Sequence, residues 1–232
     1  MARTNAEELP TGDEKVRAVR TMFDAIAPRY DMVNRVMTFR MDVGWRKRTL
    51  RDLALPHGST VLDIACGTGD LCRGLDGLGL RPIGIDMSLG MLQAARTEAP
   101  LVQSDALCLP IGDAAVDGVT CGFALRNFRE LGPFFAELAR VVRPGGRIAL
   151  LEVAEPANPV LRWGHGIYFG KVVPVIGGLL SDPAAYRYLP RSTAYLPEPA
   201  TMRAMLAEEG FEGIDRALLS TGISQLITAT RS

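Results

Sequence analysis

A glycine-rich turn between two apolar runs carries the clearest chemical signal in this sequence. Residues 61–65 are typical of a strand, Gly67-Thr68-Gly69 of a tight turn, and Asp70 of the start of a helix. Asp86 ends the next apolar run, within the reach of both ribose hydroxyls of a nucleotide bound at the turn. The pattern predicts a site for an adenosine-bearing ligand at the carboxyl ends of parallel strands.

The residues around the glycines indicate which ligand this is. A dinucleotide-binding turn favours a small residue where this chain has Cys72, and Asp63, just before the turn, would oppose a pyrophosphate. A carboxylate suits the amino group of S-adenosylmethionine instead. We therefore expect S-adenosylmethionine as the cofactor, with its methionine part surrounded by Asp63, Gly67, Thr68 and Gly69.

Other candidate residues follow the neighbouring strands. Met87 accompanies Asp86, and Asp105-Ala106 should border the adenine, with the Asp105 carboxylate accepting from its exocyclic amine. An acid after a strand is more often a helix cap. Because these positions share one edge of the predicted sheet, we expect them to act together. After the fourth strand, Arg126 either lies in a surface loop or points inward to hold an ionising hydroxyl of an acceptor.

The elements that must position these residues alternate between strand and helix, which predicts an α/β fold with a mostly parallel sheet and helices on both faces. A seven-stranded sheet closing in a C-terminal antiparallel hairpin accounts for the pattern. The predicted strands are 60–65, 82–86, 101–104, 117–123, 147–153, 214–219 and 222–230, and the helices between them start near 70, 88 and 131.

The chain is predicted to form a single domain, 1–232, with four parts. A helical part, 1–56, contains an amphipathic helix over 13–27 behind a capping box at Thr11, and a second helix over 43–53. The cofactor-binding core spans 57–155, a cap insertion 156–198, and a closing helix and hairpin 199–232.

The cap insertion is strongly apolar, with Lys171 as the single charge between Trp163 and Ser181. That length is enough for a transmembrane helix. Five glycines and Pro174 argue against one, so we expect an apolar cap over the active site, which is also compatible with contact to a membrane surface.

Charge and cysteine content limit the remaining possibilities. The formal net charge is zero, so no nucleic-acid partner is expected. Between Lys15 and Arg51, however, there are ten Lys/Arg and three acids. This excess of cations is typical of a solvated helical face or of a surface attracted to anionic lipid. The four cysteines lack the spacing of metal ligands, so no metal site is expected. We expect them to be small core residues of a reduced, cytoplasmic protein. Residues 1–10 contain no apolar run of a secretory signal.

The sequence resembles the ubiquinone/menaquinone-biosynthesis C-methyltransferase family, especially its demethylmenaquinone methyltransferase branch, from about Phe23 to Gly222. The shared motifs are Phe23-Asp24, Tyr30-Asp31-Met32-Val33-Asn34, Trp45, Leu62-Asp63 with Gly67-Thr68-Gly69-Asp70, Leu125-Arg126-Asn127, residues 140–146 with Glu152, and Ala185-Tyr186-Arg187-Tyr188-Leu189. The resemblance implies a Rossmann-like class I S-adenosylmethionine-dependent methyltransferase. The implied acceptor is a prenylated hydroquinone, methylated on a ring carbon.

The resemblance also implies roles for individual residues. Arg126 would stabilise a phenolate; weaker candidates for orienting or deprotonating the hydroxyl are Tyr30, Asp31 and His165. The expected acceptor-binding residues are Asn127, Phe169, Tyr186 and Tyr188, and Gly122 contacts the cofactor where the family has serine.

Departures from the family pattern keep a second acceptor class open. They are Val33, Thr38, Asp42, Gly122 and Arg191, together with the absence of a C-terminal His-x-Gly-x-Lys. A related methyltransferase acting on another small aromatic or secondary metabolite is therefore the alternative. Further candidate partners are an anionic membrane surface, reached from the cytoplasm at its inner face, and a second copy of the chain.

Overall fold

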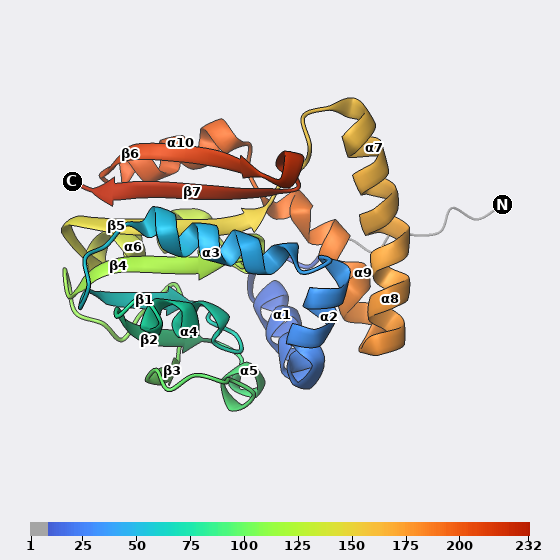
Figure 1. Cartoon of the computed structure of the whole chain (residues 1–232), viewed down its shortest axis with the longest axis horizontal. Helices are drawn as coiled ribbons and strands as arrows, with labels where there is room; N and C mark the ends of the chain where they lie inside the picture. The colour runs from blue at the N-terminus through green and yellow to red at the C-terminus, as the bar shows by residue number, and fades with distance from the viewer. Residues whose placement is uncertain (1–8) are drawn as a thin grey trace.

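The computed structural model describes residues 9–232, which are organised around one seven-stranded sheet (Figure 1). The order of strands is β3-β2-β1-β4-β5-β7-β6. The strands are β1 (Thr60–Ile64), β2 (Arg81–Asp86), β3 (Leu101–Gln103), β4 (Val116–Gly122), β5 (Val142–Val153), β6 (Phe211–Leu219) and β7 (Ser224–Arg231). Strands β1 to β5 pair in parallel, and β7 runs antiparallel to both β5 and β6. The predicted fold class is confirmed.

Helices bury both faces of this sheet. Successive strand residues point to opposite faces, so Val61 and Leu151 contribute to one apolar cluster while Ile64 and Leu150 contribute to the other. The first cluster is covered by α3 (Met41–Leu53) and α4 (Asp70–Asp76), the second by α6 (Leu131–Val141) and α10 (Pro199–Glu208).

A third apolar cluster lies beyond the carboxyl edge of the parallel strands. There the N-terminal helices meet the cap insertion, with Val33, Met37, Val173 and Tyr186 buried between them. The helices of this layer are α1 (Gly12–Ile26), α2 (Tyr30–Met37), α5 (Leu89–Gln93), α7 (Pro159–Ile167), α8 (Val173–Leu180) and α9 (Pro183–Ser192), with a π-helical turn, Tyr168–Val172, joining α7 to α8 (Figure 1).

Several local predictions were wrong. Thr11 makes no capping hydrogen bond to α1. Helix α2 was not predicted, and it follows the 3-10 turn that contains Pro28. Strand β5 begins at Val142 instead of 147, because the Pro-Gly-Gly segment forms a register shift inside the strand. Cys108 is exposed, while the other three cysteines are buried as expected.

The cap insertion forms several helices that lie across the end of the sheet. No helix within residues 9–232 is both long enough and apolar enough to cross a bilayer. The transmembrane interpretation of 163–181 therefore has no support in the described structure.

Candidate active site

A cavity lies at the carboxyl ends of the parallel strands, next to α1; its space, with the open solvent at its mouth, is about 830 Å³. The strand order places the tips of β1, β2, β3 and β4 side by side, so residues distant in sequence share this space. Six predicted cofactor residues line it: Gly67, Asp86, Met87, Asp105, Ala106 and Gly122.

Asp86 is the polar centre of this cavity. One carboxylate oxygen accepts the Gly67 N–H at 2.8 Å and the other accepts the Ser88 N–H at 2.8 Å. Burial raises the pKa of Asp86, and these two N–H donors oppose the rise. A carboxylate oxygen accepts more than one hydrogen bond, so Asp86 can still receive the hydroxyls of a ribose.

The turn at Gly67 leaves room for a ligand. Gly67 has φ +55, and a Cβ placed on it would meet no atom within 4 Å. The backbone is therefore open to close approach on this side. Together with Asp86, this open turn fits an adenosine-bearing cofactor.

Three other predicted cofactor residues do not line the cavity. Asp63 is 1% exposed and accepts hydrogen bonds from Thr120 at 2.8 Å and from the Cys72 thiol at 3.4 Å. Burial raises its pKa to about 7, despite these donors and the charge of Arg46. Thr68 donates to Asp31 at 2.6 Å, and Gly69 precedes α4. A direct cofactor contact from these three stays a prediction.

Asp105 also has a structural partner. One of its oxygens accepts the Leu107 N–H at 2.9 Å, which closes the loop after β3. The other is free of hydrogen bonds from described residues, so the predicted contact to an exocyclic amine remains open.

A second, apolar cavity adjoins the first; its space, with the open solvent at its mouth, is about 1070 Å³. It lies between α1, α2 and α3 on one side and the cap on the other. Phe23, Tyr30 and Phe123 line both cavities and form the border between them. Two ligands, one bound in each cavity, would meet at these three side chains. Transfer of a group between two bound molecules needs this arrangement.

Arg126 is the buried cation of the second cavity. Its guanidinium forms an ion pair with Glu152, and its Nε donates to Ser192 Oγ at 3.2 Å. The same side chain also donates to the Phe123 carbonyl at 2.9 Å. Its Nη2 makes no hydrogen bond to any residue in the range 9–232, so the two N–H groups of this nitrogen are left for a bound molecule. The surface-loop interpretation of Arg126 was wrong, because the side chain is 6% exposed.

Tyr30 stands at the border, between two cations. Burial raises its pKa, while Arg46 and Arg126 lower it. Arg46 lies over the Phe123 ring, 5.6 Å from its centroid, and lines the second cavity. The raised pKa favours the protonated Tyr30 hydroxyl, which can donate a hydrogen bond; its role in orienting or deprotonating an acceptor stays a prediction.

The cap contributes His165, Phe169 and Tyr186 to the second cavity. The His165 ring packs on Phe169 at 4.6 Å between centroids, and its buried Nε2 has no hydrogen-bond partner among residues 9–232. Burial lowers the pKa of His165 and raises that of Tyr186 to about 12; Ser181 lies close enough to Tyr186 to oppose the rise. The Tyr186 hydroxyl is likewise buried without a partner within that range.

Asn127 and Tyr188 lie beside each other, as an acceptor-binding pair would. The Tyr188 hydroxyl donates to the Asn127 side chain at 3.2 Å. Asn127 lines the cofactor cavity, and Tyr188 lines neither of the two cavities described above. Burial raises the pKa of Tyr188.

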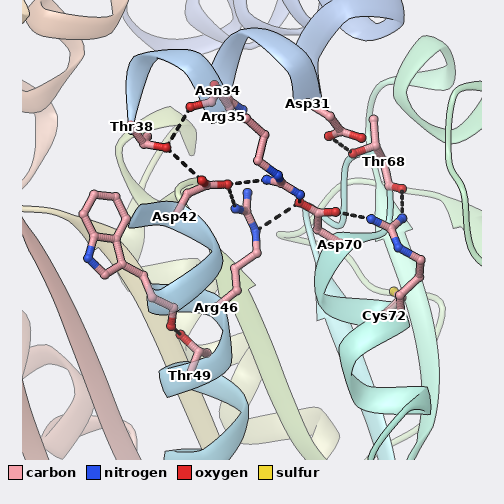
Figure 2. A network of polar contacts seen from close by, with 12 residues as sticks. Asp31, Asn34, Arg35, Thr38, Asp42, Arg46, Thr49, Thr68, Asp70 and Cys72 are labelled. Atoms are coloured by element: carbon pink, nitrogen blue, oxygen red, sulfur yellow. Dashed lines mark hydrogen bonds and ion pairs between the residues drawn. The ribbon is translucent and has the colours of Figure 1, made fainter. Parts of the chain in front are cut away.

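Figure 2 shows a polar network that fastens the N-terminal helices to the glycine turn. Asp42, 1% exposed, pairs with Arg35 and Arg46, and Arg35 also donates to Asp70 at 2.8 Å. Asp31 belongs to the same region, where it accepts from Thr68 and lies outside the second cavity's lining. The network holds α2 over the site.

Sequence reasoning missed Arg46, Phe123 and Glu152 as parts of the site. Asp42 and Arg46 are four residues apart on one helix, a spacing that brings side chains together. Glu152 is the residue before the last of β5 and Arg126 follows β4, so the adjacency of these strands was the signal for their pairing.

Comparisons with known proteins agree with this geometry. The sequence model of the ubiE/COQ5 methyltransferase family matches residues 10–231. A demethylmenaquinone methyltransferase of Roseiflexus castenholzii is 39% identical over 98% of this chain and 99% of its own length. One from Deinococcus radiodurans is 41% identical, over 90% and 92%.

A solved structure shares the fold at lower identity. The complex of the Haloferax volcanii Trm112 methyltransferase activator with the putative methyltransferase contains a chain with TM-score 0.65 and 18% identity. The match covers 90% of this chain and 96% of that one.

Proposed function

This chain belongs to the ubiE/COQ5 methyltransferase family, and on that premise we propose that it methylates a ring carbon of demethylmenaquinol, a prenylated hydroquinone. Its methyl donor is S-adenosylmethionine. The proposal is carried by one observation, the shared border of the cofactor cavity and a larger, more apolar cavity at Phe23, Tyr30 and Phe123.

The cofactor cavity supplies binding and orientation. When bound there, S-adenosylmethionine offers a methyl group on a positively charged sulfur. Asp86 holds the ribose, and the open turn at Gly67 lets the methionine part approach the backbone. At the tip of β4, Gly122 lines the cofactor cavity and Phe123, the next residue, lines both cavities.

The second cavity activates the acceptor. Loss of a phenolic proton places electron density on the neighbouring ring carbon, which is the nucleophile of the reaction. The free Nη2 of Arg126 donates to the phenolate oxygen, and the neutral Tyr30 hydroxyl can add a second hydrogen bond. Because the site is buried, such donors stabilise developing charge strongly.

His165 is the group best suited to take the phenolic proton. Its lowered pKa keeps the imidazole neutral at pH 7, and its Nε2 has no partner within the described chain. His165→Gln should then lose most of its turnover. The fall in rate at low pH, where the imidazole of His165 becomes protonated, should disappear from its pH–rate profile. A variant with an unchanged profile would return His165 to a packing role.

An assay of the purified protein tests the proposed activity. Labelled S-adenosylmethionine should transfer its methyl group to a short-tailed demethylmenaquinol, reduced before use. A parallel arm uses small aromatic acceptors without a prenyl tail. Transfer only to those molecules would favour the alternative acceptor class, and transfer to none would contradict the proposal.

A further inference from the structure

Large apolar side chains are exposed on one part of this protein to an unusual degree. On the helix formed by α7, the π-helical turn and α8, Trp163 is 72% exposed, Val175 61% and Leu179 81%. On α2 and just after it, Met32 is 50% exposed and Phe39 71%. We call these residues, with Val36, Val160 and Ile167, the cap surface. Contiguous exposed apolar patches mark interaction sites.

The two helices of the cap surface lie side by side and run in opposite directions (Figure 1). At one end, Arg29 donates to the Leu180 carbonyl at 3.1 Å. At the other, the Tyr168 hydroxyl donates to the Met37 carbonyl at 2.7 Å, and the Tyr168 ring lies 5.8 Å from that of Phe39. The helices that carry the exposed residues are therefore packed against each other, with α2 alongside α8 and the π-helical turn.

The π-helical turn keeps the exposed stripe straight. Positions 163, 167, 171, 175 and 179 are four residues apart, and in an α-helix of 3.6 residues per turn that spacing would drift around the axis. A π-helical turn takes up an additional residue. The stripe on α8 consequently continues the stripe on α7, while Val173 and Gly177 remain buried.

Cations border the cap surface, and the acids next to it in the sequence are Asp31, Glu155 and Asp182. Arg29, Arg40, Arg162 and Lys171 border or interrupt it, and none forms an ion pair with a residue in the described range. Residues 156–181 contain no Asp or Glu. Most other cations of the N-terminal part are engaged elsewhere; Lys15, for example, is buried and donates to the Phe128 carbonyl at 2.6 Å.

The apolar cavity opens in the same surface. Phe39 lines this cavity although its side chain is 71% exposed, which places it at the mouth. A molecule whose head lies near Arg126 and whose tail leaves past Phe39 would emerge among exposed apolar side chains.

We propose that the cap surface docks on an anionic lipid bilayer and that the acceptor enters from the bilayer past Phe39. An apolar stripe with a cationic rim fits acyl chains below anionic headgroups, and each cation near such a surface adds attraction. The entry route rests on the proposed function, because a prenylated acceptor partitions into lipid. The docking itself does not.

Vesicle binding tests the docking. The full chain should sediment with vesicles that contain phosphatidylglycerol, less with pure phosphatidylcholine, and less again in high salt, where surface charges are screened. Trp163→Ser combined with Leu179→Ser should weaken binding by roughly tenfold or more, because two large apolar side chains no longer enter the lipid. Leu78→Ser combined with Leu218→Ser is the matched control, since both leucines are exposed outside the cap surface.

Tryptophan fluorescence locates the contact independently. Trp163 is exposed and Trp45 is only 9% exposed, so brominated acyl chains should quench Trp163 in bound protein. Trp163→Phe should bind vesicles and lose the quenching. Binding without any quenching of Trp163 would overturn the placement of the membrane contact.

Methyl transfer separates failure of docking from failure of the proposed function. Trp163→Ser with Leu179→Ser should retain turnover on a short-tailed acceptor in solution and lose at least tenfold on a long-tailed acceptor in vesicles. Vesicle binding without transfer to either acceptor would refute the function and leave the docking intact. An equal loss of vesicle binding in the control variant would overturn the docking. So would a change in the molecular mass of Trp163→Ser with Leu179→Ser in solution without a change in its vesicle binding. That second result would identify the surface as a contact between two copies of the chain.

Discussion

Arg126 and Glu152 form an ion pair that is almost fully buried, with side chains 6% and 0% exposed. Both oxygens of Glu152 are engaged by Arg126, one by the guanidinium and one by the backbone N–H at 3.2 Å. The carboxylate therefore fixes both the charge and the loop that carries it, between the tip of β4 and the acceptor cavity.

Removal of Glu152 should destabilise the fold. In Glu152→Gln, Arg126 keeps its charge without a counter-charge, and breaking one side of a buried pair costs about 3–5 kcal/mol. Urea unfolding should report this loss. Addition of Arg126→Met should restore much of it, and a double variant as unstable as Glu152→Gln alone would contradict the assigned pairing.

Arg126 should matter for turnover more than for cofactor binding. Arg126→Ala should lower turnover on the order of a hundredfold, the size of effect seen when one stabilising donor is removed. Arg126→Lys should lie between wild type and Ala, because the planar fork is lost and the charge is kept. Cofactor affinity by calorimetry serves as the control. Near-normal turnover of Arg126→Ala on a hydroquinone would exclude its role in the chemical step.

Asp86→Ala should weaken S-adenosylmethionine binding by about tenfold or more, because hydrogen bonds to a charged group contribute roughly 1.5–3 kcal/mol. The same change frees the Gly67 and Ser88 N–H groups. Calorimetric titration measures the affinity, and Asp76→Ala, an exposed acid at the end of α4, is the matched control. Unchanged affinity in Asp86→Ala would place the ribose elsewhere.

Asp63 should make stability fall as pH rises. Its pKa is about 7 in the fold against an ordinary 3.8, so the folded state binds the proton more tightly. The contribution of this bound proton to the free energy of unfolding is fully present below pH 3.8. It declines as Asp63 of the unfolded chain ionises, and it is lost above pH 7. It amounts to at most about 4 kcal/mol. Asp63→Asn should remove this decline from urea unfolding between about pH 4 and 8.

Cofactor binding tests whether Asp63 also faces the amino group. A direct contact would favour the ionised carboxylate, so binding at a pH just below the Asp63 pKa of about 7 should release a proton. Calorimetry in buffers of different ionisation enthalpy detects that release. Binding without proton release would leave Asp63 with Thr120 and Cys72 alone.

Gly177 should not tolerate alanine. A Cβ there would overlap the Tyr186 ring, and overpacking of this kind costs about 1–3 kcal/mol. Gly164 lies in α7, where an added Cβ would meet no atom within 4 Å, so Gly164→Ala should stabilise by up to about 1 kcal/mol through helix propensity. Thermal unfolding of both variants checks the contrast. A stabilised Gly177→Ala would show that Tyr186 does not pack against α8.

The parts of the fold that follow from short-range patterns could be predicted from the sequence. The glycine turn, the alternation of strands and helices and the position of Asp86 each depend on local residue order. Helix α2 could not be predicted in this way, because its stability comes from partners such as Asp42 and Asp70. Of the apolar residues of α2, only Val33 and Met37 are buried, while Met32 and Val36 are exposed.

The candidate site shows the same division. The cofactor cavity could be predicted because its residues follow the tips of the strands. The acceptor cavity could not, because it depends on how the cap packs against the N-terminal helices. Arg126 was recognised from its unexpected place after an apolar strand. Its partner Glu152 is 26 residues away in sequence and became apparent only through the pairing of β4 with β5.

The π-helical turn between α7 and α8 lets the cap tolerate the loss of one residue but not of two. Loss of one residue from Tyr168–Val172 would restore an uninterrupted α-helix and leave α8 facing as before, because the π-helical turn already takes up one additional residue. Loss of a second residue would rotate α8 by about 100° relative to α7. Gly177 would then turn away from Tyr186, and a relative shortened by two residues would need a different set of small and large residues along α8.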